Sequence, residues 1–419
     1  MDFLTHLLAA FFPSTEWCMQ MIHNTPIAGV LVFCVSVHMT TFWIISGFLC
    51  EYQLTKLQER QKGPIQYGSF LLNRLLRLYP LYFIMSLAVY DEVVRVQRAR
   101  GEEPQCAPTT LWRSLFFSAN LFDASACVAM AWTVSVDVHG YLLIVLLFAL
   151  FPEQKHWRKS ILLTGYLVSL SYMAHEYFSM NDEGHDFFHQ NGLLGSQHLS
   201  DRKRSMVDLT KHLDTPQYWP DTDFTSPHAQ MLQDHYEKLL RLYHTSIHKH
   251  GSAMLLGSYL YMDLRDRQWK SQYPFLKVMV AVVWLFLTRA RFCFSGVGVW
   301  LLLDVLLTIE SNTTTGGAML SLFSNRLWTA LAPFTYGIYL THMIPMGYRA
   351  AHRSVWRIDE LIKKGRDACE GYNQWFILRE AVINFVIASF IAFVLHYTVE
   401  WPFTYIRRRW CRKSKESTE

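Results

Sequence analysis

Two arginines stand inside an apolar stretch of the chain, the run SFLLNRLLRLYPLY at residues 69–82. A cation held against apolar surface is costly unless it snorkels to a membrane interface, lines a polar cavity or meets an anionic partner. Arg74 and Arg77 are three residues apart, so on a helix they share one face and can hold one anion together. The spacing therefore predicts an anion site. The alternative is a pair of ordinary positive-inside membrane anchors.

An acidic residue, Asp137, lies in the segment WTVSVDVHGY at residues 132–141, which belongs to another apolar run. An acid inside a membrane span is a functional candidate by default, because its burial is costly. The alternative interpretation is a buried ion pair with Arg74 or Arg77. The two interpretations are compatible, since a carboxylate that orients a cation or an imidazole is also structural.

The composition indicates that a membrane is the solvent of this chain. Of its 419 residues, 51% are hydrophobic and 15% are aromatic, and the mean hydropathy is +0.10. Length alone would also allow a soluble α/β protein of two or three domains, but apolar runs recur from end to end with basic loops between them. The net charge of +5 is spread over those loops, so it indicates membrane orientation rather than nucleic-acid binding. The pattern of a cleaved signal peptide is missing, and insertion is expected to rest on the spans.

The apolar runs predict an all-α fold, a polytopic membrane helix bundle of about ten spans. The first run, residues 1–12, has only half the length of a span. The others are Ile27–Cys50, Ser69–Tyr90, Ala129–Phe151, Ser160–Phe178, Ser252–Met262, Val278–Thr288, Phe294–Ile309, Leu327–Met346 and Val382–Val399. We predict one membrane domain at residues 1–406, interrupted by a long, polar, His-rich loop at residues 179–250.

The charges of the connecting segments predict the topology. The basic tail at residues 407–419 should be cytoplasmic. Counting back one crossing per span places three basic connections on the same side, at residues 56–62, 153–159 and 263–270. The same count places the 179–250 loop on the extracytoplasmic side, and Arg74 and Arg77 at a cytoplasmic helix end.

Three further patterns have weaker interpretations. HDFFH at residues 185–189 has the spacing of metal ligands but lacks an evident third ligand, so no metal site is predicted. GVG at residues 296–298 lacks the strand, the third glycine and the acidic partner of a dinucleotide site. Asp304, within WLLLDVLL, is either a buried, hydrogen-bonded acid or part of a cavity lining.

Five segments taken together resemble the acyltransferase 3 superfamily, with the eukaryotic nose-resistant-to-fluoxetine type as the nearest branch. TFWIISGFL at residues 41–49 is followed by RLLRLYP, and WTVSVDVHGY resembles a W-x-L-x-V-[DE]-x-Q-x-Y segment. LAPFTYGIYLTH, residues 331–342, and EWPF, residues 400–403, resemble the late L-x-x-L-T-Y-x-x-Y-L-x-H and E-x-P-F segments. His139 stands where the family usually has glutamine, and His250 where it has arginine. His342, which closes the late segment, either lines the acceptor cavity or caps a packing contact.

This resemblance implies an integral-membrane O-acyltransferase that moves an acyl group from acyl-CoA, with acetyl-CoA as the expected donor, to a hydroxyl of a carbohydrate or lipid acceptor. Arg74 and Arg77 would then hold coenzyme A phosphates at a cytoplasmic mouth. The implied partners are the lipid bilayer and a small-molecule acceptor, without metal or nucleic acid. The expected location is the endoplasmic reticulum or the plasma membrane. Two alternatives stay open: a multi-span transporter or channel, and an inactive acyltransferase-like protein.

The resemblance also implies a catalytic histidine. A hydroxyl is almost fully protonated near neutral pH, so a base must remove its proton as it attacks the thioester. The superfamily carries this base on its first helix, upstream of SGFL, and the candidates are His6 and His38, with Asp137 as a neighbouring acid. His6 fits the order of the helices, whereas His38 falls on the second one. The half-length first run leaves open an N-terminus truncated relative to the family.

Cysteines bear on the same topology. Cys18, Cys106, Cys127 and Cys369 fall in segments assigned to the extracytoplasmic side, where disulfides form. The resemblance implies a disulfide between Cys106 and Cys127, because the eukaryotic family carries cysteines at similar places.

Overall fold

The computed structural model describes residues 26–60, 66–99, 108–118, 131–178, 247–270, 273–287, 295–312, 325–342, 344–345 and 374–405. Every regular element in these ranges is helical, which confirms the all-α prediction. Several predictions fall outside the described residues, namely His6, the Cys106–Cys127 disulfide, residues 179–246 of the predicted 179–250 loop and the 407–419 tail, whereas residues 247–250 are helical.

Most of the helices extend beyond the apolar runs that predict them. They are α3 (Pro26–Arg60), α4 (Tyr67–Ala99), α5 (Pro108–Leu115), α7 (Ala131–Leu150), α8 (Lys155–Phe178), α12 (Ile247–Asp266), α13 (Pro274–Leu287), α14 (Ser295–Asn312), α16 (Arg326–Leu331), η2 (Ala332–Phe334), α17 (Thr335–Thr341), α19 (Gln374–Leu395) and the π-helical turn η4 (His396–Glu400). At 1.5 Å per residue the 35 residues of α3 span roughly 50 Å. This length exceeds the hydrocarbon thickness of about 30 Å, so the polar last turns of α3 extend beyond it.

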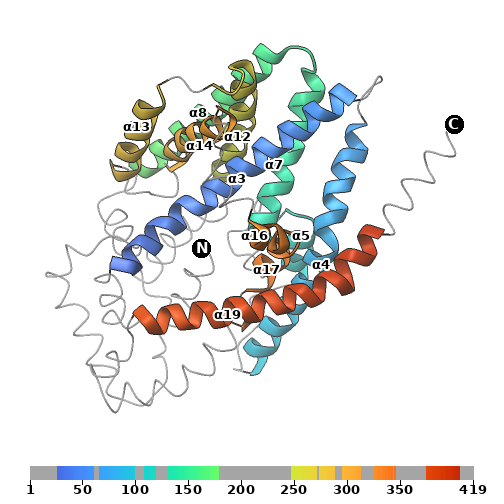
Figure 1. Ribbon diagram of the computed structural model, residues 1–419. Coiled ribbons are helices and arrows are strands. Elements are labelled where there is room, and N and C mark those ends of the chain that lie inside the picture. Colours follow the sequence, from blue (N-terminus) through green and yellow to red (C-terminus); the bar gives the residue numbers. More distant parts are fainter. Residues whose placement is uncertain are drawn as a thin grey trace.

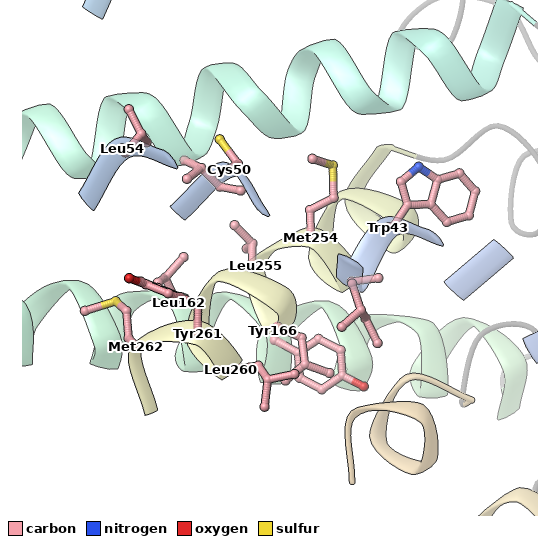
Figure 2. Packing of buried hydrophobic residues seen from close by; sticks show 14 of the residues in the cluster. Trp43, Cys50, Leu54, Leu162, Tyr166, Met254, Leu255, Leu260, Tyr261 and Met262 are labelled. Atoms are coloured by element: carbon pink, nitrogen blue, oxygen red, sulfur yellow. The ribbon is translucent and has the colours of Figure 1, made fainter. Parts of the chain in front are cut away.

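Two groups of helices make up the described structure (Figure 1). In the first, α3 packs along α12, with α7, α8 and α14 around them and α13 against α14. In the second, α4 packs against α5, α7 and α17, and α17 packs against α19. Figure 2 shows the core of the first group, where Met254 and Leu255 of α12 lie between the side chains of α3 and those of α8.

Two glycines allow α3 and α12 to pack with their backbones in contact. A Cβ atom on Gly47 would lie 1.9 Å from the carbonyl oxygen of Met254, and one on Gly257 would lie 1.9 Å from that of Ile44. Small residues at crossings of this kind are typical of membrane helices, where close packing drives association. The contact between the two backbones also fixes the positions of Ser46 and Ser258, which are adjacent to these glycines in the chain. Both serines belong to the polar clusters described below.

This crossing gives a first prediction. Gly257→Ala is expected to lower the stability of the folded protein by about 1–3 kcal/mol, because α3 and α12 must separate to admit the methyl group. The midpoint of thermal denaturation in detergent measures this effect. Gly68→Ala on α4 is the matched control, since a Cβ there has nothing within 4 Å, and it should be neutral or slightly stabilising. Equal midpoints for the two variants would contradict the tight crossing.

Parts of the described surface are apolar, as expected for helices that contact lipid. Within the described ranges, two helices are long and apolar enough to cross a membrane, at Trp132–Leu150 and Leu378–Tyr405, and two shorter apolar helices lie at Pro274–Leu285 and Ser295–Thr308. Large hydrophobic side chains of α13 and α19 are exposed, for example those of Phe275 and Phe390. Exposed apolar surface of this extent indicates contact with a membrane or a partner. The total of about ten spans stays a prediction.

Ion pairs join the three basic connections that the topology places on one side. Lys159 Nζ lies 2.8 Å from Asp263 Oδ1 and 3.1 Å from Asp266 Oδ2, and Arg265 pairs with Glu59 at 2.7 Å. The described residues of these connections, 56–60, 153–159 and 263–270, therefore meet at one end of the bundle. Burial would by itself raise the pKa of the Asp263 carboxyl, but the hydrogen bond from Lys159 and the charge of Arg267 outweigh it and hold that pKa below its ordinary value.

Asp304 is fully buried and pairs with two cations, Arg267 and Lys277. Arg267 also pairs with Asp263 at 2.7 Å. Of the two interpretations of Asp304, the structure therefore supports the buried, hydrogen-bonded acid. The 296–298 glycines are packing residues as well, because Cβ atoms on Gly296 and Gly298 would meet Tyr166 and Leu285.

Candidate acyl-transfer site

Arg74 joins three helices at the end of the bundle where the basic connections meet. Its guanidinium donates a hydrogen bond to Gln53 Oε1 of α3 at 2.7 Å, and its Cζ lies 4.4 Å from the centre of the Tyr141 ring of α7. The Phe70 ring, one turn earlier on α4, lies 5.1 Å away. Such cation–π contacts hold a guanidinium while leaving part of its donor set available. Arg74 is thus fixed at the junction of α3, α4 and α7.

Arg77 lies on the same helix and is exposed. No hydrogen bond or ion pair joins its side chain to another residue in the described part of the chain. It carries a full positive charge one turn from Arg74, at the end of α4 that adjoins the basic connections. An exposed guanidinium with its donors free is suited to bidentate binding of a phosphate or carboxylate.

Asp137 pairs with neither arginine. Ser46 of α3 donates a hydrogen bond to Asp137 Oδ1 at 3.4 Å, and the Ser46 and Tyr141 hydroxyls lie 2.6 Å apart. The buried ion pair with Arg74 or Arg77 is therefore not present in the structure. Instead, Arg74 lies over the Tyr141 ring, and Ser46 links the acid to the tyrosine hydroxyl. A carboxylate held in this way stays available to a charged or hydrogen-bonding group.

A narrow hollow between α4 and α7 adjoins this cluster. Its free volume of about 10 Å³ admits roughly one water molecule. Arg74 and Tyr141 supply its polar groups, and the remaining lining is aliphatic: Leu71, Leu75, Leu78, Val138 and Leu142.

A buried ion pair lies near this cluster, about one turn along α3 from Ser46. Arg158 of α8 lies 2.8 Å from Glu51 of α3, and the two side chains are 4% and 1% exposed. Ser258 of α12 donates to the second Glu51 oxygen at 2.8 Å, and the guanidinium of Arg158 lies 4.1 Å from the Phe148 ring centre of α7. Four helices are thus tied together one turn beyond Ser46. This arrangement positions α3 against α7 and α8.

The structure describes the two candidate bases, His6 and His38, only in part. His38 lies on α3, eight residues before Ser46, which is roughly 12 Å along the helix axis. Only its backbone is described. His6 lies outside the described residues. The structure therefore brings Arg74 and Asp137 to one junction, places Arg77 at its outer edge and leaves the choice between His6 and His38 untested.

The late segment, residues 331–342, contacts α4 and α7, which are two of the three helices that meet at Arg74. The Tyr336 hydroxyl donates to the Leu78 carbonyl at 3.1 Å, and the Tyr339 hydroxyl donates to Thr133 Oγ1 at 2.7 Å. His342 is buried, and its Nδ1 contacts the Tyr339 carbonyl one turn earlier. Its contact within its own helix favours the packing role over the lining of an acceptor cavity.

Several residues of this region were not predicted from the sequence to belong to the site. Ser46 lies in the segment SGFL, and Tyr141 lies in the segment WTVSVDVHGY. Their place in these two motif segments is the one feature of the sequence that could have marked them as site residues. Glu51 follows SGFLC directly, and an acid at the end of an apolar run is a signal for a buried partner. Nothing in the sequence identifies Arg158 as that partner, because it lies among the exposed basic residues of EQKHWRK.

The whole chain was also compared with known proteins. Residues 3–405 match the family model for the acyltransferase 3 family, described as "Acyltransferase domain". The chain belongs to the acyltransferase 3 family. The match covers both helix groups and all five motif segments. It assigns acyl transfer as the class of chemistry and a membrane as the setting. No curated protein and no solved structure matches this acyltransferase.

Proposed function

We propose that the acyltransferase moves an acyl group from acyl-CoA, with acetyl-CoA as the expected donor, to a hydroxyl of a carbohydrate or lipid acceptor. The observation that carries this proposal is the pair of arginines on α4. Arg74 is held by Gln53 and Tyr141, and Arg77 is exposed one turn away with its donors free. Paired guanidinium donors suit the phosphates of coenzyme A.

The position of the pair supports a cytoplasmic donor. Both arginines lie toward the end of the bundle where the basic connections at residues 56–60, 153–159 and 263–270 meet. Basic connections are typical of the cytoplasmic side, where acyl-CoA is available. The multi-pass topology, a cytoplasmic C-terminus and residence in the endoplasmic reticulum or plasma membrane belong to the same proposal.

The reaction needs a base, and His6 is proposed for that role, with His38 as the second candidate. The acceptor hydroxyl attacks the thioester carbon, and the imidazole takes its proton. Asp137, held by Ser46 next to Tyr141, is proposed to act on this histidine or on the acceptor.

The donor site is tested with Arg77→Ala. Loss of one charge-assisted contact to a phosphate is expected to weaken acetyl-CoA binding by about 10- to 100-fold, corresponding to roughly 1.5–3 kcal/mol. Binding of labelled acetyl-CoA to the detergent-solubilised protein measures the change. Arg77→Lys should recover only part of the affinity, because an ammonium cannot make the bidentate contact.

Arg326→Ala is the matched control for this measurement. Arg326 is an exposed arginine on α16, and no ion pair joins its side chain to another described residue. Its removal should leave both folding and acetyl-CoA affinity unchanged. Wild-type affinity in a folded Arg77→Ala variant would refute the donor site.

A further inference from the structure

The π-helical turn at the end of α19 holds a histidine–carboxylate pair. His396 Nδ1 lies 2.6 Å from Glu400 Oε2, and the two side chains are 22% and 14% exposed. Both residues lie within the apolar helix Leu378–Tyr405. Titratable groups inside a membrane helix are costly and are functional candidates by default.

The backbone around the pair is unusual. Residues 396–400 form a π-helical turn between the regular helix Gln374–Leu395 and the helical residues that follow. π-turns are rare and occur frequently at functional sites. The Phe334 ring packs edge-on against His396, with 5.0 Å between the ring centres.

The hydrogen bond with Glu400 decides which ring nitrogen is free. A carboxylate on Nδ1 fixes the orientation and tautomer of an imidazole, so the proton exchanges at Nε2. No hydrogen bond or ion pair joins His396 Nε2 to another residue among those described. The arrangement is that of a histidine oriented for acid–base chemistry, with its reactive nitrogen available.

The pair lies next to the donor helix. The π-turn packs against α4, and Figure 1 shows α19 crossing α4. Tyr336, which lies two residues after Phe334, donates its hydroxyl to the carbonyl of Leu78, the residue after Arg77. The pair therefore lies beside the helix that carries the two donor arginines.

We infer that His396, oriented by Glu400, is a further catalytic residue of the acyl transfer, the acid that protonates the departing coenzyme A sulfur. In this step the acceptor oxygen forms a bond to the acyl carbon, and its proton goes to the base. The carbon–sulfur bond breaks, and its electron pair takes the proton from His396 Nε2, which gives the free thiol. The base then releases its proton to water, and the neutral imidazole of His396 recovers one from water, so both groups return to their starting states. The inference rests on the proposed function, because it assumes a thioester donor.

The competing interpretation is structural, with Glu400 and His396 stabilising the π-turn alone. The measurement is release of free coenzyme A from acetyl-CoA, with glucose, cholesterol and diacylglycerol as trial acceptors. His396→Gln is expected to lower kcat by about 10²-fold, at the low end for acid–base catalysis because a thiolate is already a fair leaving group. The KM for acetyl-CoA should stay near that of the wild type, since Arg77 is unchanged.

Two further variants separate chemistry from structure. Added imidazole should restore part of the turnover of His396→Ala, which a purely structural role would not allow. Glu400→Gln should give a smaller loss of kcat, because Glu400 positions the ring. His175→Gln is the matched control, an exposed histidine on α8 that makes no hydrogen bond or ion pair with another described residue, and it should keep wild-type kcat.

The outcomes distinguish this inference from the proposed function. A folded wild type that releases no coenzyme A with any acceptor would overturn both. An active wild type together with an equally active His396→Gln variant would overturn the inference alone. Loss of turnover that parallels a loss of thermal stability, without rescue by imidazole, would assign the pair a structural role. If His396→Ala does not fold, the kcat of His396→Gln decides.

Discussion

Replacing Glu51 with alanine is expected to destabilise the protein by about 3–5 kcal/mol, because it leaves the Arg158 guanidinium buried without its counter-ion. The pair is 2.8 Å apart, and the Arg158 side chain is only 4% exposed, so water cannot replace the lost carboxylate. Ser258 would lose its acceptor at the same time. The midpoint of thermal denaturation in detergent, together with the yield of monodisperse protein, measures the effect.

A matched control lies on the same helix. Glu59 pairs with Arg265 at the surface, with side chains 54% and 36% exposed, and exposed pairs contribute about 0–1 kcal/mol. Glu59→Ala should therefore change the midpoint little. The double variant Glu51→Leu with Arg158→Met should recover much of the lost stability, since it removes both charges and keeps the volume. A Glu51→Ala variant as stable as Glu59→Ala would contradict the burial of the pair.

Replacing His6 with alanine is expected to lower the turnover of acyl transfer by about 10²–10⁴-fold with folding intact, because a general base typically contributes that much. His38→Ala should be milder, since His38 falls on the second helix of the family order. The measurement is turnover per folded molecule, with acetyl-CoA affinity determined separately so that donor binding and chemistry are not confused.

Two results would reassign the base. Turnover retained by His6→Ala and lost by His38→Ala would select His38. A longer natural protein with another histidine in a complete first helix would place the base upstream of Met1. Wild-type acetyl-CoA binding without turnover toward any acceptor would indicate an inactive acyltransferase-like protein that keeps the donor site.

For the candidate site, the sequence indicated which charged side chains lie in apolar helices, but not their contacts. The spacing of Arg74 and Arg77 predicted an anion site, which stays a prediction, and the structure places both arginines on α4 near the basic end of the bundle. The position of Asp137 within an apolar helix was also expected from the sequence. Its partner was not, because the structure gives it Ser46 and not an arginine. Periodicity shows which residues share a helix face, but it cannot show which helix that face will meet.

By itself the sequence determined the all-α fold, the apolar surface and the family, because each follows from hydrophobic runs and local motifs. Only the tertiary structure decided the pairing of helices, which depends on where two backbones can touch. The contact of Gly47 and Gly257 brings α3 against α12, and this places Glu51 beside Arg158 and Ser258. Those residues are far apart in the chain, and their attraction becomes strong only where packing removes water between them. The His396–Glu400 pair is different, because the two residues are four apart on one helix, but its contact with Phe334 depends on the packing of η2 against the end of α19.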